Sequence, residues 1–211
     1  MTINAKMTER TRARYQRIAP IYDSMETMSE RRFRTWRPQV WSLVRGPKVL
    51  EVGVGTGKNM SYYPQGLAIT AIDLTPGMLE RAKTRAQALS LDVNLHLGDV
   101  QALDFPDNIF DDVVATCVFC SVPDPVLGLR EIARVVKPGG QVLLLEHMRA
   151  ENPLLGLLMD VLNPVVVRMM GANINRHTVQ NVQTSGLQPI RVEDMGLGGI
   201  VKLIVATKVV M

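Results

Sequence analysis

The fold is decided by the stretch Val49-Leu50-Glu51-Val52-Gly53-Val54-Gly55-Thr56-Gly57, an apolar run that ends in three alternating glycines. The apolar run predicts a buried strand over 49–52. Glycine lacks a Cβ and tolerates positive φ, so the glycines predict a sharp turn from strand to helix where a ligand approaches the backbone closely. The spacing differs from the Gly-x-Gly-x-x-Gly of dinucleotide-binding proteins, because Lys58 stands where that pattern has glycine. The tighter turn favours a ligand without a pyrophosphate.

Further apolar runs of similar length follow along the chain. Continuous runs of this kind are typical of strands buried on both faces, as in a parallel sheet. Two helical stretches, 76–89 and 125–136, lie between them, and each opens with a proline and carries an apolar stripe with a period of about 3.6 residues. This alternation predicts a doubly wound, Rossmann-like α/β fold with helices on both faces of a mostly parallel sheet. The expected strands are 49–52, 67–72, 93–97, 113–119, 141–145, 188–194 and 201–207.

The charge of the chain is unevenly placed. The 211 residues are 46% hydrophobic and 21% charged and carry a net charge of +4, which describes an ordinary globular domain. Residues 1–45 hold ten of the 24 Lys and Arg but only four of the 20 Asp and Glu. We therefore predict a basic helical arm or lid over 1–45 and a ligand-binding domain over 46–208. Such an arm suits nucleic acid or an anionic membrane face, or is simply a solvated helix surface.

Three smaller features complete the organisation. The N-terminus has no apolar core, so no signal peptide is expected. Cys117 and Cys120 lie in an apolar stretch and are predicted to be reduced core thiols, without a disulfide framework or a metal site. Residues 152–172 form an apolar insert after the fifth expected strand, but prolines and charges interrupt it too often for a membrane span. The insert is expected to cap a pocket, to lie at a membrane interface or to pack on the core.

Carboxylates follow two consecutive expected strands. Asp73 closes the second strand and can accept hydrogen bonds from both hydroxyls of a ribose. Gly98, Asp99 and Val100 close the third strand, where the carboxylate can accept from the amino group of an adenine. Open α/β sheets bind ligands at the carboxyl ends of their strands. The glycine turn and the two carboxylates at that edge therefore predict a nucleoside site.

Four motifs resemble those of the class I S-adenosylmethionine-dependent methyltransferases. Residues 49–57 resemble the first motif, 71–79 the second, and 110–114 and 134–140 the later ones, in a match that covers about residues 15–208. The resemblance implies a seven-stranded sheet with the last strand antiparallel, and S-adenosylmethionine as the cofactor with S-adenosylhomocysteine as its product. It implies a cofactor-binding set: Glu51 before the turn; Gly53, Gly55 and Gly57 along the methionine; Asp73 at the ribose; Leu74 and Met78 beside the adenine; Gly98, Asp99 and Val100 at its edge; and Cys117 at the sulfonium.

The arm is similar to the arms of two kinds of methyltransferase. Residues 14–23, which include Tyr15, Tyr22 and Asp23, resemble the arm of bacterial phospholipid N-methyltransferases, which methylate phosphatidylethanolamine stepwise to phosphatidylcholine. Ubiquinone and menaquinone C-methyltransferases share the Tyr-Asp pair and a later Arg-x-Trp, here residues 34–36. This chain has Glu26 where the quinone enzymes tend to have asparagine, which favours the phospholipid.

The expected acceptor site follows from that resemblance and from the residue types. Tyr15 and Tyr22 are expected to close over the cofactor and orient the amine, and His147 to accept its proton. The expected phosphate ligands are basic side chains of the arm and of the segment after the insert: Arg31, Arg34, Arg176 and His177, with Arg32 and Arg37 beside them. The enzyme is then expected in the cytoplasm, peripherally bound to an anionic membrane through its arm, without a metal or nucleic acid.

Other functions remain open at this point. A quinone or a small thiol is the alternative methyl acceptor. A cofactor-binding module without activity would keep the same glycines. A nucleic-acid methyltransferase is weaker, because residues 117–120 read Cys-Val-Phe-Cys rather than an Asn-Pro-Pro-Tyr-type motif.

Overall fold

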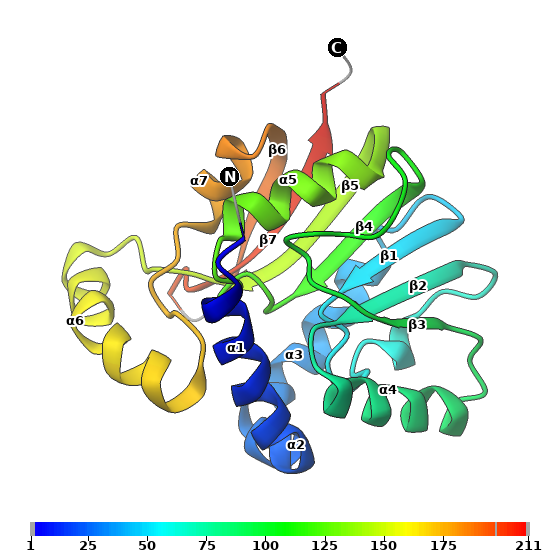
Figure 1. The fold of residues 1–211 in the computed structure, drawn as a ribbon. Helices are drawn as coiled ribbons and strands as arrows, with labels where there is room; N and C mark the ends of the chain where they lie inside the picture. The colour runs from blue at the N-terminus through cyan, green and yellow to red at the C-terminus, as the bar shows by residue number, and fades with distance from the viewer. Residues whose placement is uncertain (1–2, 197, 210–211) are drawn as a thin grey trace.

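A seven-stranded sheet with helices on both faces forms the body of the described chain, residues 3–196 and 198–209 of a computed structural model (Figure 1). The strand order is β3-β2-β1-β4-β5-β7-β6. Strand β7 runs antiparallel to both its neighbours, and the other neighbouring pairs are parallel. The expected fold with an antiparallel last strand is confirmed. The strands are β1 (Lys48–Val52), β2 (Ala68–Asp73), β3 (Asn94–Leu97), β4 (Phe110–Thr116), β5 (Val136–His147), β6 (Leu187–Gly196) and β7 (Val201–Lys208).

The helices fall into an arm before the sheet and connections within it. The arm consists of α1 (Ala5–Ile18), the 3₁₀ turn Ala19–Ile21, α2 (Tyr22–Met25) and α3 (Thr27–Trp41). Asn4 caps α1 by accepting a hydrogen bond from the Met7 amide. The helical elements that connect the strands are the 3₁₀ turn Met60–Tyr62, α4 (Pro76–Ala88), α5 (Pro125–Val135), α6 (Pro153–Met170) and α7 (Thr178–Thr184). Of these, α4 and α5 begin at prolines, as expected.

Both faces of the sheet are buried, which is why its strands read as continuous apolar runs. On one face, Leu50 and Val52 of β1 belong to the cluster that contains side chains of α5 and α7. On the other face, Val49 packs in a cluster with Trp36, Val40 and Trp41 of α3. Helix α4 covers β2 on the same side, with Ala82 and Ala86 in a cluster with Ala71. The carboxyl ends of the parallel strands therefore emerge between the arm and α4–α5 (Figure 1).

Strand β4 differs from its expected range of 113–119. It begins at Phe110, because the carboxylate of Asp112 accepts hydrogen bonds from the Arg45 and Gly46 amides at 2.6 and 2.8 Å. It ends at Thr116, because Cys117 has a positive φ of 54° that turns the chain out of the sheet. The turn is held by Glu146, which accepts hydrogen bonds from the Val118 and Phe119 amides at 2.7 and 3.1 Å.

Strand β5 begins at Val136, five residues before the expected start at Gln141. The pairing with β4 shifts register here, since Phe110 pairs with Val136 and Asp112 with Gln141. Gly139 has a φ of +76° within this irregularity, and a Cβ on Gly140 would lie 2.5 Å from the Asp111 carbonyl oxygen. The Pro-Gly-Gly segment therefore forms a bulge inside the strand instead of a loop before it.

The apolar insert forms one helix, α6, which stands to the side of the sheet (Figure 1). Asn152 caps it by accepting hydrogen bonds from the Leu154 and Leu155 amides, and Gly171 ends it with a φ of +86°. Over the described residues, no helix combines the length and the apolar character needed to cross a membrane.

Candidate active site

The glycine turn after β1 forms the floor of the candidate site. Gly53, Gly55 and Gly57 have φ values of +65°, +55° and +81°, which side chains rarely tolerate. A Cβ on Gly53 would lie 2.5 Å from Val118 Cγ2, and one on Gly57 would lie 2.8 Å from Met60 Sδ. A Cβ on Gly55 would meet no described atom within 4 Å and would project into open space. The turn thus packs closely on two sides and stays open on the third.

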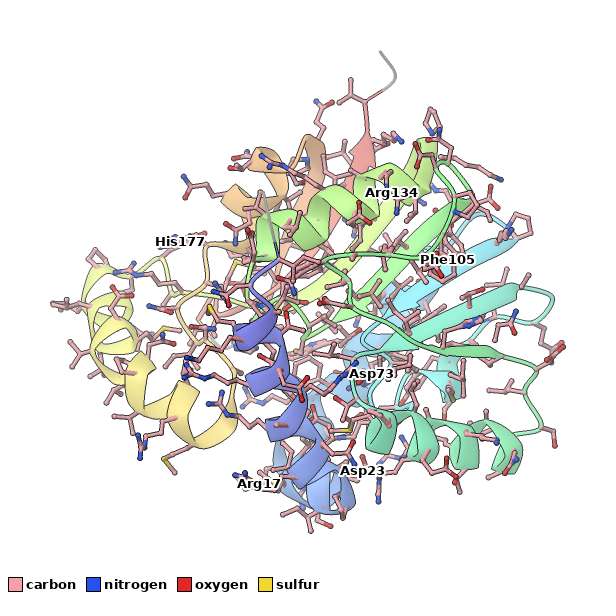
Figure 2. The ribbon with its side chains drawn as sticks, in the orientation of Figure 1. Arg17, Asp23, Asp73, Phe105, Arg134 and His177 are labelled. Atoms are coloured by element: carbon pink, nitrogen blue, oxygen red, sulfur yellow. The ribbon has the colours of Figure 1, made fainter. Side chains whose placement is uncertain are left out.

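Asp73 joins this turn to the end of β2. Its carboxylate accepts hydrogen bonds from the Gly55 amide and from the Thr75 amide, both at 2.9 Å. Burial raises the pKa of Asp73, and these amide donors counter that effect. The carboxylate is thereby held in one position at the mouth of the turn, where Figure 2 shows it between α1 and α4.

Two connected cavities lie above the glycine turn. The larger, of about 730 Å³ and partly open to solvent, runs along the ends of β1, β2, β3 and β4. The smaller, of about 460 Å³, lies between the glycine turn and the arm, and we call it the arm cavity. Eleven of the residues expected at the site line the larger cavity: Tyr15, Tyr22, Gly53, Gly55, Asp73, Leu74, Met78, Gly98, Asp99, Val100 and Cys117.

Helix α1 covers the larger cavity through polar contacts. The Arg12 guanidinium donates to the Leu74 carbonyl at 3.1 Å, and Gln16 accepts from the Gly77 amide at 2.9 Å. The hydroxyls of Tyr15 and Ser121 are 2.5 Å apart. These contacts hold α1 over the larger cavity, so the arm covers part of its opening (Figure 1). Ser121 was not predicted from the sequence, because a single serine in a loop belongs to no recognisable motif.

Asp23 fastens the arm to the body of the protein. Its carboxylate accepts hydrogen bonds from the Thr56 hydroxyl at 2.6 Å, from Arg81 at 3.2 Å and from Arg85 at 2.9 Å, and Lys58 Nζ lies 3.8 Å away. Burial alone would raise the pKa of Asp23, but the bonds from Thr56 and Arg81 and the nearby cations lower it. The Tyr-Asp pair of the arm therefore places its aspartate on the glycine turn and on α4 at once (Figure 2).

Burial favours the uncharged forms of two tyrosines, a cysteine and a histidine in this region. Burial is the main cause that raises the pKa values of Tyr15 and Tyr22 far above their usual range. Burial also raises the pKa of the Cys117 thiol and lowers that of the His147 imidazole. His147 ends β5 and, within the described chain, lies outside the residues that line either cavity.

Glu51 lies behind the glycine turn, outside the residues that line the two cavities of the described chain. Its side chain accepts hydrogen bonds from Tyr63 Oη and, at 2.6 Å, from Asn59 Nδ2. The residue is only 1% exposed, and desolvation raises the pKa of its carboxyl from 4.5 to about 7. Its direct contact with a cofactor remains a prediction. In the structure, the Glu51 carboxylate positions the Asn59 side chain.

The expected phosphate ligands do not form one cluster. Arg31 and Arg34 are exposed on α3, whereas Arg176 and His177 precede α7 on the opposite face of the sheet. Arg176 donates to the Val122 carbonyl at 2.7 Å, and Figure 2 shows His177 well away from Asp73. Arg37, grouped with the exposed arginines in the sequence, is buried and faces the arm cavity.

Known proteins resemble the chain over this same region. A family model described as a methyltransferase domain matches residues 50–144. A phosphatidylethanolamine N-methyltransferase from Cereibacter sphaeroides is 42% identical over 113 residues, which are 52% of this chain and 56% of that protein. The match thus spans little more than half of that relative. A demethylmenaquinone methyltransferase from Renibacterium salmoninarum is 33% identical over 176 residues, which are 81% of this chain and 71% of that protein.

This chain belongs to the class I S-adenosylmethionine-dependent methyltransferases. Its fold matches the solved structure of a geranyl diphosphate C-methyltransferase from Streptomyces coelicolor A3(2), in complex with Mg²⁺, geranyl diphosphate and S-adenosyl-L-homocysteine. The TM-score is 0.69 at 15% identity, over 90% of this chain and 84% of that chain. The expected family and the expected cofactor, S-adenosylmethionine, are both confirmed.

The larger cavity of this methyltransferase has the chemistry that an adenosyl group needs. The half-buried carboxylates of Asp73 and Asp99 stand at the ends of two neighbouring strands, with apolar side chains such as Met78 and Val100 between them. Open space lies above Gly55. Among the described residues, no group of His, Cys, Asp or Glu is arranged to hold a metal ion.

We expect Glu51→Gln to remove a pH-dependent destabilisation of this methyltransferase. The folded state binds the Glu51 proton more tightly than the unfolded chain does, so stability falls as pH rises from 4.5 through about 7. The variant should therefore match the wild type near pH 4.5 and exceed its free energy of unfolding by up to about 3 kcal/mol near pH 8. Urea denaturation across this range measures the difference. Glu80→Gln, an exposed position, is the control, and a Glu51→Gln curve parallel to the wild type would contradict the assignment.

Proposed function

We propose that this methyltransferase methylates the amino group of phosphatidylethanolamine at an anionic membrane surface, towards phosphatidylcholine. The observation that carries the proposal is the exposed face of α6. Leu154, Val161 and Met169 are 81%, 67% and 75% exposed. Leu155, Leu157, Leu158, Leu162 and Val165 add further exposed apolar side chains to the same helix. A helix of this kind buries its apolar face in the boundary between lipid headgroups and acyl chains.

The apolar helix is tied directly to the wall of the cavity. Asn173, just after α6, donates from its backbone amide and from its side chain to the Cys120 carbonyl, both at 2.9 Å. Asn163 of α6 donates to the Asn173 side chain at 3.2 Å. Cys117 and Ser121 of the same turn line the larger cavity. A membrane that holds α6 therefore lies next to the opening that a lipid headgroup would enter.

The arm adds positive charge beside this apolar surface. Helix α1 runs along the end of α6, since a Cβ on Gly171 would lie 2.6 Å from Arg14 Cδ. Arg17 points outward from α1 (Figure 2). Exposed cations near a membrane gain about 1 kcal/mol each from anionic lipids. The exposed arginines of the arm are Arg10, Arg17, Arg31, Arg32 and Arg34. The apolar face of α6 and the exposed arginines of the arm together support peripheral binding to the cytoplasmic face of a membrane.

The cofactor-binding roles follow from the larger cavity. We propose that Asp73 accepts from the ribose hydroxyls and Asp99 from the adenine amino group. Leu74, Met78 and Val100 would pack on the base. Bound there, S-adenosylmethionine supplies the methyl group. Gly98 and Val100 would flank the adenine edge, while Gly53 and Cys117 would surround the sulfur.

The residues proposed to bind the methyl acceptor lie near the end of the larger cavity that α1 covers. Tyr15 and Tyr22 have ring centroids 6.3 Å apart and keep their phenolic protons. Their oxygens can accept hydrogen bonds from an amine and orient it, but the phenols cannot act as bases near neutral pH. His147 is kept neutral by burial and is the proposed proton acceptor. Arg176 and His177 lie on the other face of the sheet from the exposed arginines of α3, so the headgroup phosphate is assigned to the arm side.

The two kinds of relative favour different acceptors. The phosphatidylethanolamine N-methyltransferase has the higher identity, and the demethylmenaquinone methyltransferase has the longer match. Both acceptors are membrane lipids, so the α6 surface suits either. Glu26, which lines the arm cavity, provides a carboxylate that suits an enzyme for a basic nitrogen better than one for a quinone.

Asp73→Ala should weaken the binding of S-adenosylhomocysteine by roughly 10- to 100-fold, because the ribose hydroxyls lose a charged acceptor worth about 1.5–3 kcal/mol. The variant also loses the bond that positions the Gly55 amide. Isothermal titration calorimetry measures the affinity, with Asp92→Ala, at an exposed position, as the control. Equal affinities for the variant and the wild type would refute the assignment.

Labelled methyl groups should pass from S-adenosylmethionine to phosphatidylethanolamine in vesicles that also contain anionic lipid. The products are separated by lipid chromatography, which also counts the methyl groups added. Vesicles of phosphatidylcholine, anionic lipid and a demethylated menaquinone form the second arm. Transfer to the quinone while phosphatidylethanolamine stays inert would replace the proposed acceptor with the quinone.

Leu158→Asp combined with Val161→Asp should release the protein from anionic vesicles. Both side chains are exposed, and each buries apolar surface worth about 1–2 kcal/mol at the interface, so the double variant should lose roughly 30- to 1,000-fold in vesicle affinity. Vesicle sedimentation measures this loss, while S-adenosylhomocysteine binding should not change. Gln180→Asp combined with Gln183→Asp adds the same charge to exposed positions of α7 and should have little effect. Retained sedimentation of the α6 variant would show that α6 does not face the membrane.

A further inference from the structure

The turn after β4 supplies one wall of the larger cavity. Its residues in that wall are Cys117, Val118, Ser121, Val122 and Pro123. Cys117 has a positive φ of 54°, a conformation that a residue with a side chain rarely adopts. Val118 also packs against the glycine turn, since a Cβ on Gly53 would lie 2.5 Å from its Cγ2. The position of this wall therefore depends on contacts from other parts of the chain.

Glu146 of β5 provides the first of these contacts. Its Oε1 accepts hydrogen bonds from the Val118 and Phe119 amides at 2.7 and 3.1 Å. The residue is completely buried, so water cannot replace either bond. An ionised carboxylate accepts such bonds roughly twice as strongly as a neutral acceptor does. The negative charge of Glu146 therefore helps to hold the turn in its left-handed conformation.

The segment before α7 holds the other end of the turn. Asn173 donates to the Cys120 carbonyl from its backbone amide and from its side chain, both at 2.9 Å. Arg176 donates from Nη2 to the Val122 carbonyl at 2.7 Å. The turn is thus held through its amides at one end and through its carbonyls at the other.

Glu146 and Arg176 also influence each other. In the described chain, Glu146 Oε2 and Arg176 Nε are buried without a hydrogen-bond partner. Burial raises the pKa of the Glu146 carboxyl from 4.5 to about 7, while the amides of the turn and the Arg176 charge oppose that rise. The charge of Glu146 therefore changes near neutral pH, and Arg176 is a cation that favours the ionised form.

Other charged or titratable groups also lie around Glu146. Burial and the Glu146 charge raise the pKa values of the Cys117 and Cys120 thiols, so neither thiol ionises near pH 7. Lys202 lies opposite Glu146 on β7 and pairs with Glu151. His147 follows Glu146 in β5, and successive strand residues point to opposite faces of a sheet. A change in charge on this face near neutral pH is therefore expected from Glu146.

We propose that Glu146 is a positioning residue of this methyltransferase, whose negative charge, supported by Arg176, sets the turn after β4 against the bound cofactor. Within the described chain, neither residue lines a cavity, so the effect passes through the backbone of the turn. Ionised Glu146 then favours cofactor binding, and by linkage the bound cofactor favours the ionised carboxylate. The inference rests on the cofactor and on neither choice of methyl acceptor.

Calorimetry with S-adenosylhomocysteine, between about pH 5.5 and 8.5, tests the role of the charge. Glu146→Gln keeps an oxygen that can accept from the amides but carries no charge. Near pH 8 its affinity should be roughly 3- to 30-fold weaker than that of the wild type. The difference should disappear as pH falls below about 7, because the wild-type carboxyl is then protonated too.

Asp112→Asn is the matched control. Asp112 is also buried, and its carboxylate accepts hydrogen bonds from the Arg45 and Gly46 amides at 2.6 and 2.8 Å. It lies near the start of β4, at the end of the strand away from the cavity. The variant should therefore bind S-adenosylhomocysteine with the affinity and the pH profile of the wild type. An equal loss in both variants would make the role of Glu146 merely structural and would overturn the inference.

Arg176→Gln keeps the inference testable if Glu146→Gln does not fold. Removal of the cation should raise the pKa of Glu146, so the rise in affinity with pH should shift to higher pH. An unchanged midpoint in a folded Arg176→Gln variant would contradict the proposed role, as would equal affinities of Glu146→Gln and the wild type near pH 8. Neither result would bear on the proposed lipid substrate, which label transfer tests by itself.

Discussion

The three left-handed residues of the glycine turn are the constraint on which the site depends. Gly53 lets the turn after β4 come close, Gly55 gives its amide to Asp73, and Gly57 lets Met60 approach. The same segment continues with Thr56, which donates to Asp23 of the arm, and Asn59, which accepts from Arg37. A short piece of backbone thus touches β2, β4 and the arm at once. A side chain at Gly53 would meet Val118 and one at Gly57 would meet Met60, whereas at Gly55 it is the positive φ that disfavours a side chain.

The arm consists of two parts that are held in different ways. In the described chain, α1 and α2 contain no fully buried residue, and hydrogen bonds of Arg12, Gln16 and Asp23 join them to the body. Helix α3 buries Trp36, Val40 and Trp41 against the sheet. Segments with few buried apolar contacts open locally at low cost, whereas core helices open only with the whole domain. Local opening of α1 and α2 therefore costs less free energy than opening of α3.

Much of the site could be predicted because its residues stand where strands end. Asp73 and Asp99 follow apolar runs, and the carboxyl ends of parallel strands share one edge of the sheet. The turn after β4 could not be predicted, because Cys117 adopts a positive φ that depends on Glu146 of a different strand. The early start of β5 likewise depends on a bulge that pairs Val136 with Phe110. Each of these two features depends on a residue that is distant in the sequence. The local sequence pattern therefore does not predict it.

The arginines of α3 illustrate the same limit. Arg31, Arg34 and Arg37 look alike in the sequence, yet only Arg37 turns inward. Its position depends on the phase of the helix against Trp36 and on Asn59 across the arm cavity. A prediction that treated the arginines as one basic surface therefore assigned to lipid phosphate a side chain that faces the glycine turn.

The neutral tyrosines and the neutral histidine near the cavity bear on how an amine would become a nucleophile there. Burial keeps Tyr15 and Tyr22 protonated and favours the neutral form of His147, because surroundings of low polarity disfavour charge. An ethanolamine nitrogen that enters the same surroundings meets the same penalty, which lowers its pKa and favours the free amine. On the proposed function, the covering arm itself would promote deprotonation, and His147 would only have to receive a proton that the cavity already disfavours. The cover that α1 provides would then serve the acceptor as much as the cofactor, because water in an uncovered cavity would favour the ammonium form.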